Sequence, residues 1–223
     1  MKILLALVIA LTFLACSSKP SMQPLVSEAP ESIGLNQVKD SGFDTFFLHR
    51  DFSKQGYHTI MLEPLKLDNL EIDDSRLEFL DRDWRMTDKD RQRWREMFQK
   101  RASDTFSGDA NEFTLAESAA PGVLKVEFEF VRFTPTAPKD DARSRPFNDK
   151  ILTRSIGRLD IKINIVDSGS GDQLAYIEDS REVGDNSYPE LERNNRITND
   201  HKLRLEMSSW LSTLKSELNE LSR

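Results

Sequence analysis

Alternation of apolar and polar side chains predicts most of the strands in this chain. Within the segment 123–133, apolar side chains stand at every second position from Leu124 to Phe130, with lysine and glutamate between them. That period is typical of a strand with one buried and one wet face. Residues 158–165 repeat the pattern. Residues 173–183 follow after a polar turn at 167–172, so the two segments predict a hairpin.

Two helices and one further strand complete the predicted pattern. Residues 57–67 predict a strand with a proline close to its end. Residues 88–106 predict an amphipathic helix, because Thr87 and Asp90 resemble a capping box and apolar residues share one face. That face carries Trp94, Met97, Phe98, Ala102 and Phe106. Apolar residues then recur at helical spacing from 203 to 221, which predicts a long closing helix.

These elements run in the order strand, helix, strand, strand, strand, helix. Two helices with one apolar stripe each can cover one face of a sheet. We therefore expect an α+β fold, a two-layer sandwich in which two amphipathic helices cover one face of a mainly antiparallel four-stranded sheet (order β-α-β-β-β-α). Residues 1–15 are expected to be a lipoprotein signal peptide, residues 16–38 a lipidated flexible tether rich in Ser and Pro, and residues 39–223 a single periplasmic α+β domain.

A short apolar run ends at Cys16, the one cysteine of the chain. Lys2 gives the run a positive start, residues 3–14 are almost wholly apolar, and Ala15 is the small residue that a signal peptidase needs beside the cut. The pattern resembles a bacterial lipobox, with Phe13 where Leu is usual. It predicts cleavage before Cys16 and attachment of acyl groups such as palmitate, so that Cys16 is the lipid attachment site and the membrane is a partner through it.

The length of the apolar run argues against a spanning helix, which needs roughly 20 apolar residues. A cleaved secretory signal that leaves a free cysteine stays open as the alternative. If Cys16 carries lipid, no thiol remains for a disulfide partner, a zinc site or a nucleophile. Ser17 stands where Asp commonly retains lipoproteins at an inner membrane. By resemblance to that sorting rule, we expect the bacterial outer membrane, with the domain facing the periplasm.

Charge and histidine content narrow the classes of function. A formal net charge of −7 argues against a nucleic-acid partner. His49, His58 and His201 lie in different predicted elements, so we expect no metal site. The chain has no Gly-x-Ser-x-Gly elbow and no phosphate-binding or dinucleotide glycine loop. We therefore assign no catalytic residue and no cofactor.

Several acidic clusters have a simpler structural interpretation than a site. Residues 167–172 superficially suggest a calcium loop, but they lack EF-hand spacing and a closing glutamate, which favours a hairpin turn. The charged stretches 181–185 and 190–195 are interpreted as solvated loops. The carboxylate pairs at 73–74 and 140–141 are interpreted as chance neighbours in an acid-rich chain.

Four aromatic residues suggest a groove. Trp84 stands just before the first predicted helix, outside its apolar face, and with Phe43, Phe46 and Phe47 it could line a site for a peptide, lipid or glycan. Packing in the core is the favoured interpretation of these side chains.

Segments spread along the chain resemble a known family: Ser41-Gly42-Phe43, Tyr57–Leu67, Gly157–Asp167, Gly171–Ala175 and Trp210. Together they are similar to the bacterial lipoprotein family called domain of unknown function 3313, over about residues 38–221. Members usually continue the first element with Leu where this chain has Asp44, and have Thr-Gly where it has Ser170-Gly171. The resemblance implies an envelope lipoprotein and no established activity.

The sequence therefore favours a lipid-anchored envelope protein that acts as a non-enzymatic binding or scaffolding module for other envelope proteins. Two alternatives stay open. A cell-wall-directed hydrolase would need a cleft with two carboxylates about 5 to 10 Å apart. A small-ligand carrier would need an apolar pocket between the helices and the sheet.

Overall fold

The structure is a computed structural model that describes residues 34–50, 52, 56–77, 84–107, 113–138, 151–184 and 191–221. The predicted signal peptide, most of the predicted tether, Cys16 and the carboxylate pair at 140–141 lie outside the described residues. The first strand begins at Leu35, so the folded part starts before the predicted domain boundary at residue 39.

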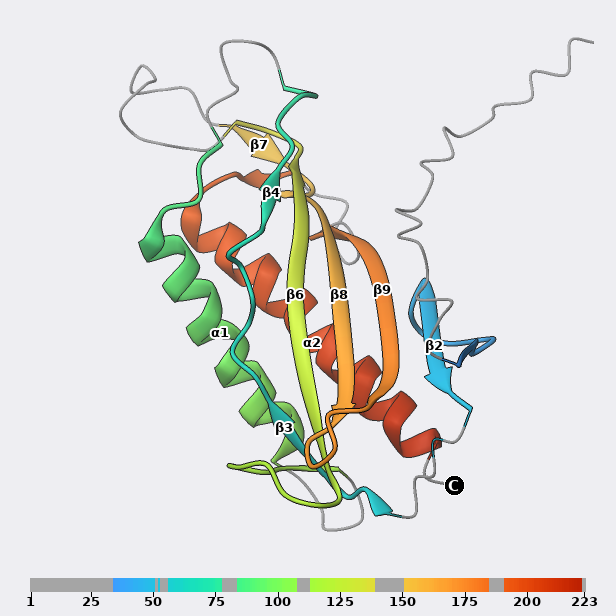
Figure 1. The fold of residues 1–223 in the computed structure, drawn as a ribbon. Coiled ribbons are helices and arrows are strands. Elements are labelled where there is room, and N and C mark those ends of the chain that lie inside the picture. The colour runs from blue at the N-terminus through green and yellow to red at the C-terminus, as the bar shows by residue number, and fades with distance from the viewer. Residues whose placement is uncertain are drawn as a thin grey trace, which may run out of the picture.

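Within the described residues, eight strands form one sheet in the order β1-β2-β9-β8-β6-β3-β5, with β4 also paired to β6. The strands are β1 (Leu35–Gln37), β2 (Thr45–His49), β3 (Thr59–Leu62), β4 (Glu71–Ile72), β5 (Thr114–Leu115), β6 (Val123–Pro135), β8 (Gly157–Asp167) and β9 (Gln173–Val183). The three long strands at the centre, β6, β8 and β9, are antiparallel neighbours (Figure 1).

The prediction of a mainly antiparallel four-stranded sheet is wrong, because the sheet is larger and mixed. Strands β3 and β4 run parallel to β6, and β5 runs parallel to β3. The predicted strand over residues 57–67 is shorter, since β3 ends at Leu62, before Pro64. The aromatic segment after Ser41 contributes β2, which pairs with β9.

The α+β class and the two helices are confirmed. Helix α1 (Asp88–Phe106) begins at the predicted capping box, where Thr87 Oγ1 accepts from Asp90 N and the Asp90 carboxylate accepts from Thr87 N. Helix α2 (Arg196–Glu220) begins before residue 203, where the predicted apolar pattern starts. Its first turn is capped by Asn195, whose side chain accepts from Ile197 N. Neither of these described helices has the length and apolar character needed to cross a bilayer.

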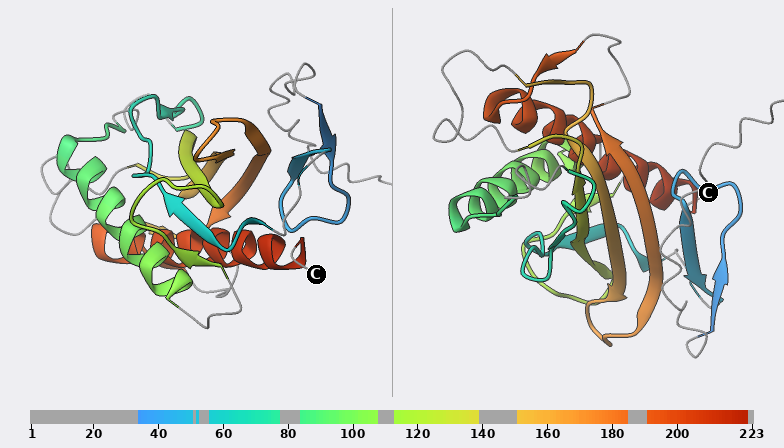
Figure 2. Two further views of the ribbon diagram at one scale, coloured as in Figure 1. Left: turned by 60° about the horizontal axis from the view of Figure 1, so that its bottom comes forward. Right: turned by 90° about the horizontal axis from the view of Figure 1, so that it is seen from above.

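Both helices pack against the same face of the sheet (Figure 2). Phe98 of α1 contacts Phe128 of β6, with ring centroids 4.9 Å apart, and Trp210 of α2 contacts Phe130, with centroids 5.8 Å apart. Residues two apart on a strand share one face. A register shift between Phe130 and Arg132 then brings Phe133 back to the helix side, where it is fully buried.

A second, two-stranded sheet lies at the end where both helices begin (Figure 1). It pairs β7 (Leu152–Thr153) with β10 (Glu192–Arg193). The solvated-loop interpretation of residues 190–195 is therefore wrong for its described part. Asn194 is buried and its side-chain amide donates to the Pro138 carbonyl at 2.9 Å.

Candidate functional site

A pocket of about 330 Å³ lies between the starts of α1 and α2. Its apolar lining consists of Trp84, Met86, Trp94, Ile156 and Leu203. Its polar lining consists of Thr87, Lys89, Asp90, Arg93, Arg196, Asn199 and Asp200. A volume near 300 Å³ is at the lower end of what small-molecule sites use.

Two aromatic contacts fix the apolar wall of this pocket. Trp84 packs edge-on against Phe133, with centroids 4.9 Å apart, and its indole Nε1 donates to the Ala137 carbonyl at 2.8 Å. Trp94 also meets Phe133 edge-on at 6.2 Å. The indoles are held by the sheet and the segment that follows β6, so the wall does not depend on a ligand for its shape.

Charged residues at the pocket fall into two groups. Arg93 forms ion pairs with Asp90 at 2.8 Å and with Asp200 at 3.1 Å, which ties α1 to α2. Lys89 and Arg196, by contrast, are exposed and form no ion pair within the described part of the chain. Each stands in the first turn of its helix. The pocket lining therefore has three cations and two carboxylates, a net positive charge, and Lys89 and Arg196 are the two cations without an ion-pair partner among the described residues.

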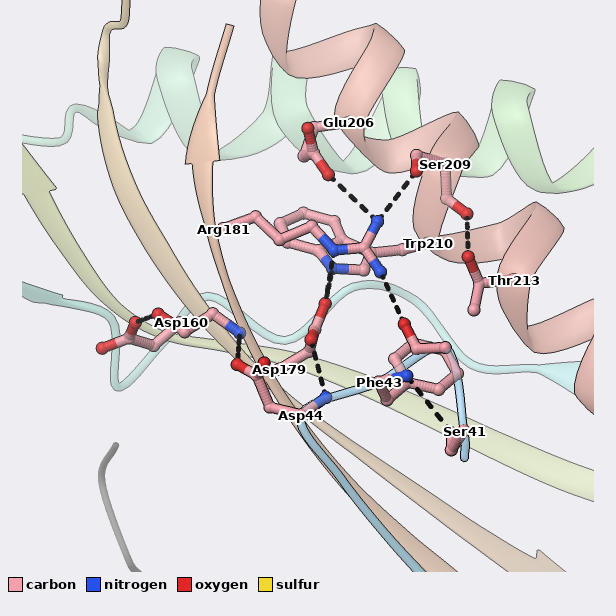
Figure 3. Close-up of polar contacts among 12 residues, drawn as sticks. Ser41, Phe43, Asp44, Asp160, Asp179, Arg181, Glu206, Ser209, Trp210 and Thr213 are labelled. Carbon is pink, nitrogen blue, oxygen red and sulfur yellow. Dashed lines mark hydrogen bonds and ion pairs between the residues drawn. The ribbon is translucent and has the colours of Figure 1, made fainter. Parts of the chain in front are cut away.

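A second polar site joins β9 to α2 farther along the sheet, around Arg181 (Figure 3). The Arg181 guanidinium contacts Asp179 at 2.6 Å and Glu206 at 3.2 Å. The Trp210 indole Nε1 donates to Asp179 at 2.7 Å. Asp179 and Glu206 are both buried, and the positive charge of Arg181 between them offsets part of the cost of burying these carboxyl groups.

Burial is the largest influence on the pKa values of Glu206 and Asp44. Burial raises the pKa of Glu206, the Arg181 guanidinium opposes that rise, and Asp179 adds to it. Burial and the nearby Asp179 raise the pKa of Asp44, while the Ser180 N–H lowers it. Because each carboxylate is engaged by donors of the protein itself, the cluster holds elements together and offers little to a substrate.

The chain before β2 is fastened to the same cluster. Asp44 N donates to Asp179 at 3.0 Å, and Asp44 Oδ2 accepts from Ser180 N at 3.0 Å. Gly42 N donates to Glu217 of α2 at 2.6 Å. A Cβ at Gly42 would lie 2.7 Å from Thr213 Cγ2, so this close approach to the helix requires glycine.

A shallow depression beside Asp44, Asp179 and Ser180 has a volume of only about 40 Å³. That is about the space of one water molecule. It is far too small for a sugar ring, so the carboxylates near Arg181 do not form the cleft that a glycoside hydrolase needs.

The structure separates the residues that the sequence grouped as a possible aromatic groove. Trp84 lines the pocket at the helix starts. Phe43, just before β2, and Phe46, in β2, are both buried, and β2 pairs with β9. Core packing is thus confirmed for these two phenylalanines, and Trp84 combines packing with a pocket wall.

The acidic turn, the histidines and Arg181 lie in separate parts of the fold. Asp167 Oδ1 accepts from Gly169 N and Ser170 N at 2.8 and 2.7 Å, which confirms the hairpin turn. His58 and His201 are exposed and His49 is half-buried, in separate parts of the fold. The interpretation of Arg181 as a solvated loop charge is wrong, because its side chain is 18% exposed and faces α2.

A positional signal in the sequence points to Arg181 and Asp179. Both lie on the same face of β9 as Ala175, Ile177 and Val183, which are the most deeply buried apolar residues of that strand. An opposite-charge pair two apart on an apolar face indicates an internal ion pair. The pocket carries a weaker signal, because its lining comes from segments far apart in the chain.

Comparison with known proteins gives one family and a weak structural likeness. A search of curated proteins finds no match. The PelC dodecamer from Paraburkholderia phytofirmans is 7% identical with a TM-score of 0.36, covering 81% of this chain and 96% of that one. A single-residue variant of that dodecamer is 9% identical with a TM-score of 0.35, covering 72% and 88%.

The family model described as protein of unknown function (DUF3313) matches residues 27–213. This range contains both the pocket at the helix starts and the Arg181 cluster. The chain therefore belongs to the DUF3313 family of proteins of unknown function.

Proposed function

We propose that this protein is a lipid-anchored, non-enzymatic binding module of the bacterial envelope, tethered through Cys16 and facing the periplasm from the outer membrane. The observation that carries the binding role is the pocket of about 330 Å³ between the starts of α1 and α2. Its apolar wall is built by tryptophans that the fold itself holds in place. Preorganised walls of this kind favour binding, because little ordering is needed when a ligand enters.

The charged interior supports binding over catalysis. Asp179 and Glu206 share the Arg181 guanidinium, and Asp179 also accepts from Trp210. A general acid must be able to give its proton to a substrate in reach. Buried carboxylates already occupied by protein donors are poorly suited to that task, so the hydrolase alternative receives no support from this cluster.

Photo-crosslinking in cells tests the binding role. A photoreactive amino acid is placed at Lys89, on the rim of the pocket, and in a matched protein at the exposed Lys39, which follows the edge strand β1 and does not line the pocket. The proposal expects an envelope component that is captured repeatedly from position 89 and not from position 39. Equal capture from both positions, or none from position 89, would contradict a binding role for this pocket.

A further inference from the structure

We infer that the pocket at the helix starts binds a small amphipathic anion, with an apolar group inside and a carboxylate or phosphate at the rim. The inference rests on the proposed binding function and adds the chemistry of the ligand. Three features carry it: the apolar wall, the size of the pocket, and the two unpaired cations.

The apolar wall and the volume define the buried part of the ligand. Trp84, Trp94 and Leu203 present indole and aliphatic surface, which favours a hydrocarbon chain or ring over a hydrated group. A pocket of about 330 Å³ holds roughly ten non-hydrogen atoms, if each takes about the 30 Å³ of a water molecule. The ligand is therefore the size of a medium-chain fatty acid.

Charge defines the other end of the ligand. The carboxylates of Asp90 and Asp200 are directed to Arg93, and Asp90 also accepts from the backbone of Thr87. This leaves Lys89 and Arg196 without a negative partner. Both stand in the first turn of a helix, where the helix dipole disfavours a cation. An anion at the rim would be attracted by both side chains and by both helix ends.

The setting makes this positive rim unusual in the molecule. The chain carries a formal net charge of −7, and helix α2 has no acidic residue in its first turn. Because cations at these two positions weaken the helices without forming an internal ion pair, a role in holding an anion accounts for them.

Titration of octyl compounds tests the inference. The full mature chain carrying Cys16→Ser is used, so that no detergent is needed, and binding is followed by calorimetry. Octanoate and octyl phosphate should bind, octanol about tenfold more weakly, octyltrimethylammonium not detectably, and inorganic phosphate alone about tenfold more weakly than octyl phosphate. A preference between octanoate and octyl phosphate identifies which headgroup the rim takes. Equal binding of octanol, or binding of the octyl cation, would overturn the inference.

Variants of the rim separate this inference from general stickiness. Lys89→Gln and Arg196→Gln should each weaken octanoate binding about threefold, as expected for one exposed charge pair, and leave octanol binding unchanged. Lys39→Gln is the matched control, with an exposed lysine away from the pocket. The melting temperature of both rim variants should stay level or rise, since a cation leaves a helix start. Unchanged octanoate affinity in both variants would overturn the inference.

Failure of the ligand class and failure of the binding role give different results. If no octyl compound binds while crosslinking from position 89 still captures an envelope component, the inferred ligand chemistry is wrong and the binding role stands. If crosslinking fails and octanoate binds as described, the pocket takes the ligand without engaging an envelope component.

Discussion

Asp179 of β9 accepts a hydrogen bond from the indole Nε1 of Trp210 in α2 at 2.7 Å, with both side chains buried. The same carboxylate contacts Arg181 at 2.6 Å and accepts from Asp44 N at 3.0 Å. One side chain therefore joins the long hairpin, the closing helix and the segment before β2. The β2 side of the sheet and helix α2 are held to β9 by polar contacts as well as by the apolar core.

Asp179→Ala should destabilise the protein by about 3–5 kcal/mol, because it removes the acceptor of the buried Trp210 indole and one of the two carboxylates that contact Arg181. Urea unfolding measures the change. Asp68→Ala is the matched control: its ion pair with Arg95 is exposed, and its loss should cost less than about 1 kcal/mol. Similar losses in the two variants would show that the Asp179 contacts contribute no more than a surface pair.

Arg181→Met should destabilise the fold more at high pH than at low pH. Burial raises the pKa of Glu206 above its ordinary 4.5, and Arg181 opposes that rise. Without Arg181, the folded state favours the protonated carboxyl. The contribution of the Glu206 carboxyl to stability is then fully present below its ordinary pKa. It is lost as the pH rises through the pKa that Glu206 has in the folded protein.

The measurement is urea unfolding of Arg181→Met at about pH 5 and about pH 8, where a loss of about 3–5 kcal/mol is expected at the higher pH. Arg132→Met, which removes a pair with the exposed Glu71, serves as the control and should show less than about 1 kcal/mol at both pH values. A loss that is independent of pH would contradict the assigned role of Arg181.

Gly42→Ala should cost about 1–3 kcal/mol, because the added Cβ would lie 2.7 Å from Thr213 Cγ2. Thr213→Ser removes that methyl group and keeps the hydroxyl that donates to the Ser209 carbonyl at 2.9 Å. The double variant should therefore recover most of the loss. Gly56→Ala, where a Cβ meets nothing within 4 Å, is the neutral control. Additive losses in the double variant would place the strain elsewhere.

Cys16→Ser should release the protein from membranes and abolish acyl labelling, because acyl chains on this thiol are the proposed anchor. Cell fractionation with metabolic fatty-acid labelling measures both effects. Ser17→Ala leaves the thiol in place and is the matched control. A Cys16→Ser protein that stays in the membrane fraction would rule out lipidation as the anchor.

The long elements could be predicted because their periodicity covers many residues. Phe128 and Ile163 lie in strands whose alternation extends over most of their length, and the hairpin that follows has a polar turn. For helix α1, the capping box at Thr87 also marks where the helix begins, and the predicted and observed bounds agree.

The short strands could not be predicted, because two to five residues carry almost no periodic signal. Strands β4 and β5 have two residues each and pair through their backbones with strands that lie elsewhere in the chain. Their parallel direction depends on where the chain returns to the sheet. This is why the sheet is wider and more mixed than the sequence pattern indicated.

Only part of the candidate pocket could be predicted from the sequence. Trp84 could be singled out because it lies outside the apolar face of the following helix. Its neighbours in the pocket, Ile156 and Leu203, come from a strand connection and from the other helix. The cations Lys89 and Arg196 look like ordinary surface charges until the fold brings the two helix starts together.

The most direct measurement of the central claim is a two-dimensional NMR spectrum of the tryptophan indole N–H groups during titration with octanoate. The chain has three tryptophans, of which Trp84 and Trp94 line the pocket and Trp210 is bound to Asp179. The account predicts that the Trp84 and Trp94 signals shift in a saturable manner while the Trp210 signal stays in place, and that octyltrimethylammonium shifts none of them. Signals that do not move with octanoate, or that move equally for all three indoles, would contradict it.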